Sequence, residues 1–272
     1  MHRIDIDAYF SRIAYAGPRA PTLEVLRQIV LRHVVAIPFE SLNPFAGLPV
    51  LLDPAALEQK MVQGRRGGYC FEQNLLLWNV LQQLGFEVSG LAARVVWNSP
   101  SSPLPRSHML LRIELNGTSY LVDVGFGGLT LTGVLNLIPD IEQTTPHEAF
   151  RLLHVSGEYV MQANVRGEWR SQHHFDLQPQ LPVDYEPVNW YLSTYPQSRF
   201  VTNLVAARSE PGRRYALLNR ELAIHELRGE THRRVLQDAA ELARTLQEIF
   251  LIDLPADERI ERALARLFAE GS

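Results

Sequence analysis

The sequence has a single cysteine, Cys70, among its 272 residues. One cysteine cannot form a disulfide within the chain, and it cannot build a cysteine-rich zinc site without other ligands. Disulfide bridges and thiolate clusters are therefore excluded as sources of stability. If Cys70 matters for function, the chemistry of its thiol is the reason.

Long apolar runs are also missing. No stretch approaches the roughly 20 uninterrupted apolar residues that span a bilayer, and the first residues lack the apolar core of a signal peptide. We therefore expect a cytoplasmic chain without a membrane partner. The net charge of -4, with acidic and basic residues mixed along the chain, gives no electrostatic reason to expect nucleic acid. Small molecules are the expected partners, and the oligomeric state stays open.

Internal repeats and Gly/Ser linkers are absent too, so the organisation has to be inferred from periodicity. With 46% hydrophobic residues, the chain can bury one large core or two to three small ones. Thr22 is placed to cap a helix, and Asp53-Pro54 is the start signal of a second, short one. An apolar stripe predicts a third helix from Cys70 to Leu84, with Gly85 as its terminator. The first third is therefore predicted to be helical.

The rest of the chain has a different pattern. Short alternating strands are predicted between Val88 and about Tyr191, with hairpin turns at Asn116-Gly117 and Arg166-Gly167. The last third mixes two further strands with two helices, which start near Asp238 and Ala256. This order of elements predicts an α+β protein.

The Asn116-Gly117 turn fixes the register of its hairpin, because a two-residue turn leaves one pairing of the two strands. Leu111 then opposes Val122. His108 and Asp123 share the more polar face as diagonal neighbours, about 7 to 8 Å apart at the backbone. A carboxylate bonded to one imidazole nitrogen fixes the tautomer and leaves the other nitrogen as a base. The hairpin thus predicts two members of a catalytic triad, with a surface His–Asp pair as the alternative.

Cys70 is the candidate nucleophile. An isolated buried cysteine is ordinarily an inert small hydrophobe. Cys70 differs because it opens a helix, whose first-turn amides and dipole stabilise a thiolate. The preceding segment Arg65-Arg66-Gly67-Gly68 adds positive charge and a close approach for substrate. A nearby imidazolium would complete the activation, but the sequence pattern alone does not dock the hairpin against this helix.

Four segments resemble the arylamine N-acetyltransferases and occur in that family's order. They are Ile37-Pro38-Phe39-Glu40-Ser41-Leu42, Arg66-Gly67-Gly68-Tyr69-Cys70-Phe71-Glu72-Gln73-Asn74, His108-Met109-Leu110-Leu111 and Tyr120-Leu121-Val122-Asp123-Val124-Gly125-Phe126-Gly127. The resemblance extends from about Ile6 to Arg208 and weakens in the C-terminal third. It implies an α+β fold related to papain-like and transglutaminase-like enzymes. The implied parts are a helical bundle (1–87), a β-barrel (88–195) and an α/β lid (196–272).

The resemblance also implies an activity. Cys70, His108 and Asp123 would form a triad that takes an acetyl group from acetyl-CoA and passes it to a small aromatic amine or hydrazine. Acetyl-CoA is then a co-substrate, and no cofactor is bound permanently. The amine would lie near apolar side chains, namely Phe39, Val95 or Val96, Phe126 and Phe200.

The implied coenzyme A site is the turn that follows the aspartate segment. Backbone amides in a Gly/Thr turn can hold pyrophosphate. The residues concerned are Gly127, Gly128, Thr130, Thr132 and Gly133. Val134 follows where many members of the family have proline, which changes the rigidity of the turn. An ion pair between Arg66 and Glu40 is implied as structural support for the site.

Other interpretations of the same residues stay open. The triad could serve a cysteine hydrolase or transglutaminase-like enzyme, or a branch of the family that closes an amide such as a macrolactam. A non-catalytic binding module is a further alternative. His173-His174 suggest a metal, but no carboxylate or cysteine lies at ligand spacing around them. Adjacent strand residues also point to opposite faces, so we expect no metal.

Overall fold

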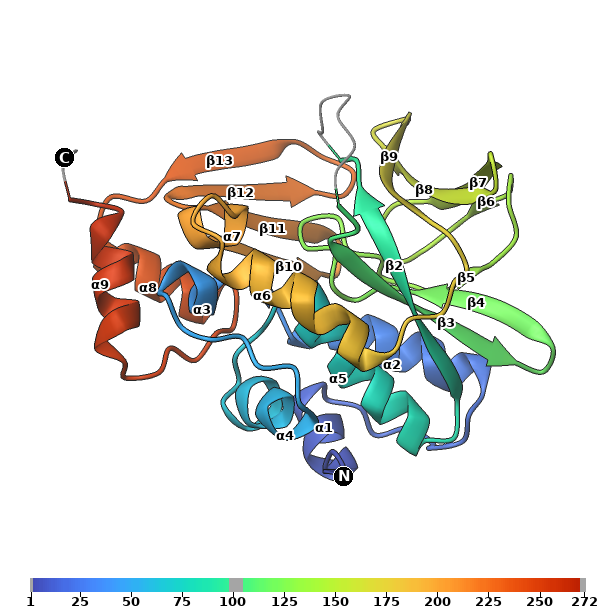
Figure 1. Cartoon of the computed structure of the whole chain (residues 1–272). Coiled ribbons are helices and arrows are strands. Elements are labelled where there is room, and N and C mark those ends of the chain that lie inside the picture. The colour runs from blue at the N-terminus through green and yellow to red at the C-terminus, as the bar shows by residue number, and fades with distance from the viewer. Residues whose placement is uncertain (1, 98–104, 270–272) are drawn as a thin grey trace.

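A computed structural model describes residues 2–97 and 105–269 (Figure 1). The N-terminal part is helical, and its helices are α1 (Ile6–Arg12), α2 (Leu23–Ala36), α3 (Leu42–Phe45), α4 (Pro54–Leu57), the π-helical turn η1 (Glu58–Gln63) and α5 (Cys70–Gln83). Thr22 caps α2 and Asp53 caps α4, each by accepting a backbone N–H in the first turn. Both predicted helix starts are confirmed, and so is the start of α5 at Cys70.

The middle of the chain forms an eight-stranded antiparallel sheet in the order β5-β4-β3-β2-β9-β8-β7-β6. Its strands are β2 (Glu87–Val95), β3 (His108–Leu115), β4 (Thr118–Val122), β5 (Leu135–Asn136), β6 (Glu142–Gln143), β7 (Phe150–Val155), β8 (Glu158–Val165) and β9 (Glu168–Phe175). The sheet curves into a near-closed barrel around its own core (Figure 1). The predicted turn at Arg166-Gly167 joins β8 to β9, and both residues have positive φ.

The C-terminal part contains a five-stranded antiparallel sheet in the order β1-β10-β11-β12-β13. Its strands are β1 (Phe39–Glu40), β10 (Val205–Glu210), β11 (Arg213–Leu218), β12 (Glu221–Glu226) and β13 (Thr231–Val235), accompanied by the 3-10 turn η2 (Pro182–Tyr185) and the helices α6 (Glu186–Thr194), α7 (Arg199–Thr202), α8 (Ala239–Glu248) and α9 (Glu258–Arg266). Phe39 of β1 pairs with Ala207 of β10, which ties the first third to the last. The predicted α+β fold of helices, barrel and α/β region is confirmed.

Helix α6 was not predicted, since strands were expected up to about Tyr191. Trp190 and Tyr191 favour strands by propensity, but both are exposed in the structure, at 69% and 41%. Val188 and Leu192, at a spacing of i and i+4, are partly buried against the core beside the buried Asn189 and Ser193, and Pro187 occupies the first turn. These two exposed aromatic residues therefore made the segment look like a strand rather than a helix.

The β3–β4 hairpin has the predicted register, with Leu111 opposite Val122. One face, including Met109, packs against the N-terminal helices. The other face was expected to be the more polar one. Near the site it is apolar instead, because Leu110 and Leu121 lie in the barrel core there. The described parts of the chain contain no helix with the length and apolarity required to cross a bilayer.

Candidate active site

Cys70 is the first residue of α5, and its side chain is almost fully buried. The preceding N–H of Tyr69 donates to Glu72 Oε2 at 3.0 Å, which fixes the start of the helix. Cys70 Sγ lies 3.8 Å from the carbonyl oxygen of Ser107. A Cβ at Gly125 would come within 2.6 Å of Cys70 Cα, so only glycine lets the segment after β4 approach the helix this closely.

His108 and Asp123 are hydrogen-bonded to each other next to Cys70. His108 is the first residue of β3, and its Nε2 lies 2.7 Å from Asp123 Oδ2. The neighbouring thiol of Cys70 also favours the charged form of His108. Burial opposes a charged imidazole, but the carboxylate of Asp123 and the hydrogen bonds outweigh this effect and raise the pKa of His108 to about 10. Burial likewise opposes a charged carboxyl, yet His108 holds the pKa of Asp123 below its usual value. The pair is therefore an imidazolium and a carboxylate at neutral pH.

Asn74 fastens the hairpin to the helix that carries Cys70. Its Nδ2 donates to the carbonyl of Met109 at 2.8 Å and to Asp123 Oδ1 at 3.1 Å. Its Oδ1 accepts from the N–H of Val124 at 3.1 Å. Reasoning from the sequence assigned no role to Asn74, although it lies four residues after Cys70 and hence on the same side of the helix. This buried amide contributes to the docking that the pattern alone could not supply.

A buried charge cluster supports the start of α5. Arg66 Nη2 lies 2.7 Å from Glu40 Oε1, so Arg66 and Glu40 do form an ion pair. Lys60, the only lysine of the chain, lies 2.6 Å from Glu72 Oε1 and 3.6 Å from Glu40 Oε1. Burial opposes ionisation of Glu40, but the charges of Arg66 and Lys60 lower its pKa. Two cations thus balance two carboxylates beside the thiol.

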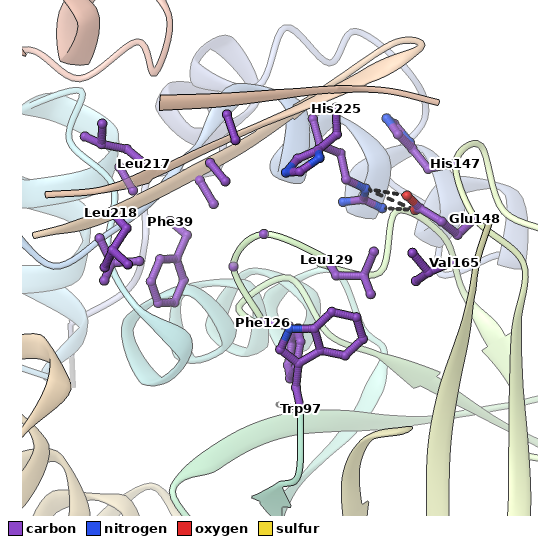
Figure 2. Close-up of a pocket in the computed structure, with 18 of the residues that line it drawn as sticks. Phe39, Trp97, Phe126, Leu129, His147, Glu148, Val165, Leu217, Leu218 and His225 are labelled. Atoms are coloured by element: carbon purple, nitrogen blue, oxygen red, sulfur yellow. Dashed lines mark hydrogen bonds and ion pairs between the residues drawn. The ribbon is translucent and has the colours of Figure 1, made fainter. Parts of the chain in front are cut away.

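A cavity of about 970 Å³ lies between the barrel and the C-terminal sheet and reaches Cys70 and His108. Figure 2 shows Phe39, Trp97 and Phe126 among the side chains that line it. Phe200 and Val95 also line it, whereas Val96 is not among its described lining residues. Reasoning from the sequence did not identify Trp97 as part of the site. The cavity therefore offers an apolar, mainly aromatic surface beside the thiol.

The Gly/Thr turn contributes only partly to this cavity. Gly127 and Gly128 line it. Thr130 and Thr132 are buried, at 3% and 0% exposure, and their hydroxyls are used within the fold. Thr130 Oγ1 accepts from the N–H of Gly127, and Thr132 Oγ1 contacts Thr145 and His147. A Cβ at Gly133 would also meet Thr145.

Positive charge gathers at the other end of the cavity. The arginines that line it there come from the β8–β9 turn and from the β11–β13 region: Arg166, Arg213, Arg228 and Arg233. Arg214 is also present but binds Glu148 with several hydrogen bonds, which Figure 2 marks with dashed lines. Arg213 is half-buried and pairs with Glu210 and Glu226, whereas Arg166, Arg228 and Arg233 are exposed. These three exposed arginines make this end suited to an anion.

One metal-like group occurs among the described residues. His108, Asp123 and His173 offer ligand atoms that lie within 4.8 Å of one another. The spacing of His173-His174 in the sequence did not reveal this group, because its carboxylate comes from a distant hairpin. His108 and Asp123 are already bonded to each other, and this geometry suits general acid–base chemistry with the adjacent thiol.

Comparisons with known proteins agree with this chemistry. A family model described as N-acetyltransferase matches residues 22–259. The chain is 44% identical to an arylamine N-acetyltransferase of Mycobacterium tuberculosis, over 97% of both chains. It is 40% identical to an Escherichia coli arylamine N-acetyltransferase, over 90% of this chain and 88% of that one. The solved structure of Mycobacterium marinum arylamine N-acetyltransferase in complex with CoA matches with a TM-score of 0.92 at 41% identity, covering 97% and 99% of the two chains.

Proposed function

This chain belongs to the arylamine N-acetyltransferase family, and we propose that Cys70, His108 and Asp123 are the triad with which it transfers the acetyl group. The chain is an acetyl-CoA-dependent arylamine N-acetyltransferase. The observation that supports the triad is the buried His108–Asp123 bond directly beside a thiol at a helix N-terminus. The relatives that match nearly the whole chain are acetyltransferases rather than hydrolases or binding modules.

In the first half of the reaction, the Cys70 thiolate attacks the carbonyl carbon of acetyl-CoA. The tetrahedral intermediate collapses, the bond to the sulfur of coenzyme A breaks, and an acetyl-thioester forms on Cys70. The imidazolium of His108 gives its proton to the departing thiolate. Asp123 keeps the imidazole in the required tautomer throughout. Free coenzyme A then leaves before the amine reacts.

In the second half, the amine nitrogen attacks the acetyl-thioester, and His108 accepts the proton that the nitrogen loses. Collapse of this intermediate expels the Cys70 thiolate and restores the ion pair. Weakly basic aromatic amines and hydrazines suit this step because they keep a free lone pair near neutral pH, unlike alkyl ammonium groups. Phe39, Phe126 and Phe200 supply the surface against which the ring packs.

We place the phosphates of coenzyme A at the arginine end of the cavity. Coenzyme A carries a pyrophosphate and a ribose phosphate at the end opposite its thiol, so a donor with its thioester at Cys70 extends its anionic end along the cavity. Arg228 and Arg233 are exposed there, and arginine binds phosphate with paired hydrogen bonds. Gly127 and Gly128 would then line the path of the pantetheine arm. The phosphates would then bind arginine side chains rather than the backbone amides of the Gly/Thr turn.

The acetyl-cysteine intermediate gives a direct test. Incubation with acetyl-CoA should add one acetyl group to the intact protein, and peptide mapping should place it on Cys70. An arylamine added afterwards should remove that group with a matching yield of acetylated amine. Cys70→Ala serves as the control and should stay unmodified. Turnover without any acetyl-protein under rapid quenching would contradict the proposed route.

A further inference from the structure

His173 lies next to the triad without a hydrogen-bond partner. It belongs to β9, where it pairs with Val95 of β2 and Met161 of β8, and its side chain is fully buried. Neither ring nitrogen has a hydrogen-bond partner among residues 2–97 and 105–269. Buried polar groups are nearly always hydrogen-bonded, and one that is not lowers the stability of the fold. A side chain that carries this cost beside a reactive site calls for an explanation.

The ring of His173 is held against the catalytic histidine. Its centroid lies 5.1 Å from that of His108 and 5.6 Å from that of Phe126. Phe175 closes the site from the same strand, with a centroid distance of 5.8 Å. The imidazole therefore packs among aromatic rings and lies next to the His108–Asp123 ion pair. Its sequence neighbour His174 is partly exposed.

The ring is neutral when the enzyme works. Burial, followed by the positive charge of His108, lowers the pKa of His173 to about 3. The titratable groups that act on it are His108, Asp123 and His174. A neutral imidazole carries one N–H donor and one lone pair on opposite sides of the ring, and thus a substantial dipole. In an apolar interior such a dipole acts on nearby charges far more strongly than it would in water.

We propose that His173 is a positioning residue of the triad, whose fixed imidazole dipole stabilises the His108 imidazolium and the Asp123 carboxylate. Asp123 Oδ1 already accepts from Asn74 and Gly125, while among the described residues Oδ2 accepts only from His108. One ring nitrogen of His173 lies within 4.8 Å of a ring nitrogen of His108 and of a carboxylate oxygen of Asp123. A dipole organised by folding needs no rearrangement as His108 gains and loses its proton in the two half-reactions. This role rests on the proposed triad.

His173→Phe gives a sharp test because it keeps the ring and removes both nitrogens. Removing two unpartnered buried nitrogens should leave the melting temperature unchanged or raise it. If the dipole acts on the ion pair, alkylation of Cys70 by iodoacetamide at neutral pH should slow by about tenfold, and its pH profile should shift upward. The kcat for arylamine acetylation should fall similarly, with KM for acetyl-CoA unchanged. His173→Gln, which keeps a donor and an acceptor, should recover part of the rate.

The matched control is His174→Phe, the same change one residue later on the strand, which should leave alkylation unchanged. A folded His173→Phe protein with the wild-type pH profile overturns the inference. If that variant does not fold, ¹⁵N-histidine NMR of the wild-type enzyme decides instead. The His173 ring signals should stay those of a neutral imidazole and shift when Cys70 is alkylated, and signals that do not respond overturn the role.

His108→Gln separates this inference from the proposed function. If His108→Gln alkylates as fast as the wild-type enzyme, the triad itself is wrong. If His108→Gln is slow while His173→Phe is not, only the role of His173 fails.

Discussion

Asp123 is fully buried, and its carboxylate holds His108 through a single hydrogen bond of 2.7 Å. In Asp123→Asn the volume is nearly unchanged, but the amide can donate to His108 and so stabilise the wrong tautomer. We expect kcat for arylamine acetylation to fall by about four orders of magnitude, as the equivalent change does in serine proteases. Steady-state kinetics with acetyl-CoA and an arylamine would measure the loss.

The control for this change is Asp176→Asn, which removes an aspartate that pairs with Arg106 and is not among the described residues lining the cavity. That variant should turn over at the wild-type rate. Circular dichroism should show that both proteins are folded. Wild-type kcat in folded Asp123→Asn would remove the aspartate from the mechanism.

At the scale of single residues, the sequence predicts a partner only where local geometry places it. His108 and Asp123 could be paired because a two-residue turn fixes the strand register. Asn74 and His173 reach the same site from α5 and from β9, which are separated from the hairpin by many residues. Contacts of that kind depend on packing between elements, and no local period encodes them.

The turn between β12 and β13 carries a testable part of the coenzyme A site. Arg228 lies in this turn and Arg233 on β13, and both line the cavity. Because an exposed arginine–phosphate contact contributes about 1 kcal/mol, each alanine variant should raise KM for acetyl-CoA by about fivefold. The salt dependence of KM should become weaker, since fewer phosphate charges are then neutralised by the protein.

Two controls isolate the phosphate contact. With p-nitrophenyl acetate, a donor that has no phosphates, both alanine variants should match the wild-type rate. Arg259→Ala removes an exposed arginine that pairs with Asp257 on α9, and it should not change KM for acetyl-CoA. Equal KM values for acetyl-CoA in all of these proteins would move the phosphates elsewhere.

At the scale of elements, cap residues and tight turns were reliable signals because each acts through its nearest neighbours. Thr22 and Asp53 mark helix starts, and Asn116-Gly117 marks a turn, as the structure shows. Helix α6 was missed because its exposed aromatic residues imitate a strand. The faces of the β3–β4 hairpin were misjudged near the site because the barrel closes over the second face, which only its partner strands reveal.

At the scale of the whole molecule, the parts of the chain are interlocked. We propose the division 1–87, 88–195 and 196–272, whose residues 1, 98–104 and 270–272 lie outside the described ones. β1 from the first part completes the sheet of the last part, and α5 packs against β2 and β3. The cavity lies where these parts meet, so the site depends on their joint folding. We therefore expect conditions that weaken the core to inactivate the enzyme.

Two buried histidines make the stability of the whole fold sensitive to mild acid. Burial lowers the pKa of His33 to about 4 and that of His173 to about 3. Both rings are neutral in the folded and unfolded states above about pH 6.5, so their contribution to stability is complete there. Below that pH the unfolded chain binds protons that the folded chain excludes. Stability should then fall by about 1.4 kcal/mol per pH unit for each histidine until the folded pKa is reached.

Urea denaturation at pH values from about 6.5 to about 5 measures this effect while most carboxyl groups stay ionised. Burial raises the pKa of Glu72, and this group therefore opposes the loss of stability as the pH falls. The pKa of His108 is raised to about 10, so its contribution to stability declines only above about pH 6.5. His33→Gln isolates one histidine, because glutamine does not titrate and can still bond Tyr9 and Gln73 in the place of the ring. The slope of unfolding free energy against pH should drop by about 1.4 kcal/mol per pH unit in that variant. Parallel pH dependences for the two proteins would show that His33 does not resist protonation in the fold.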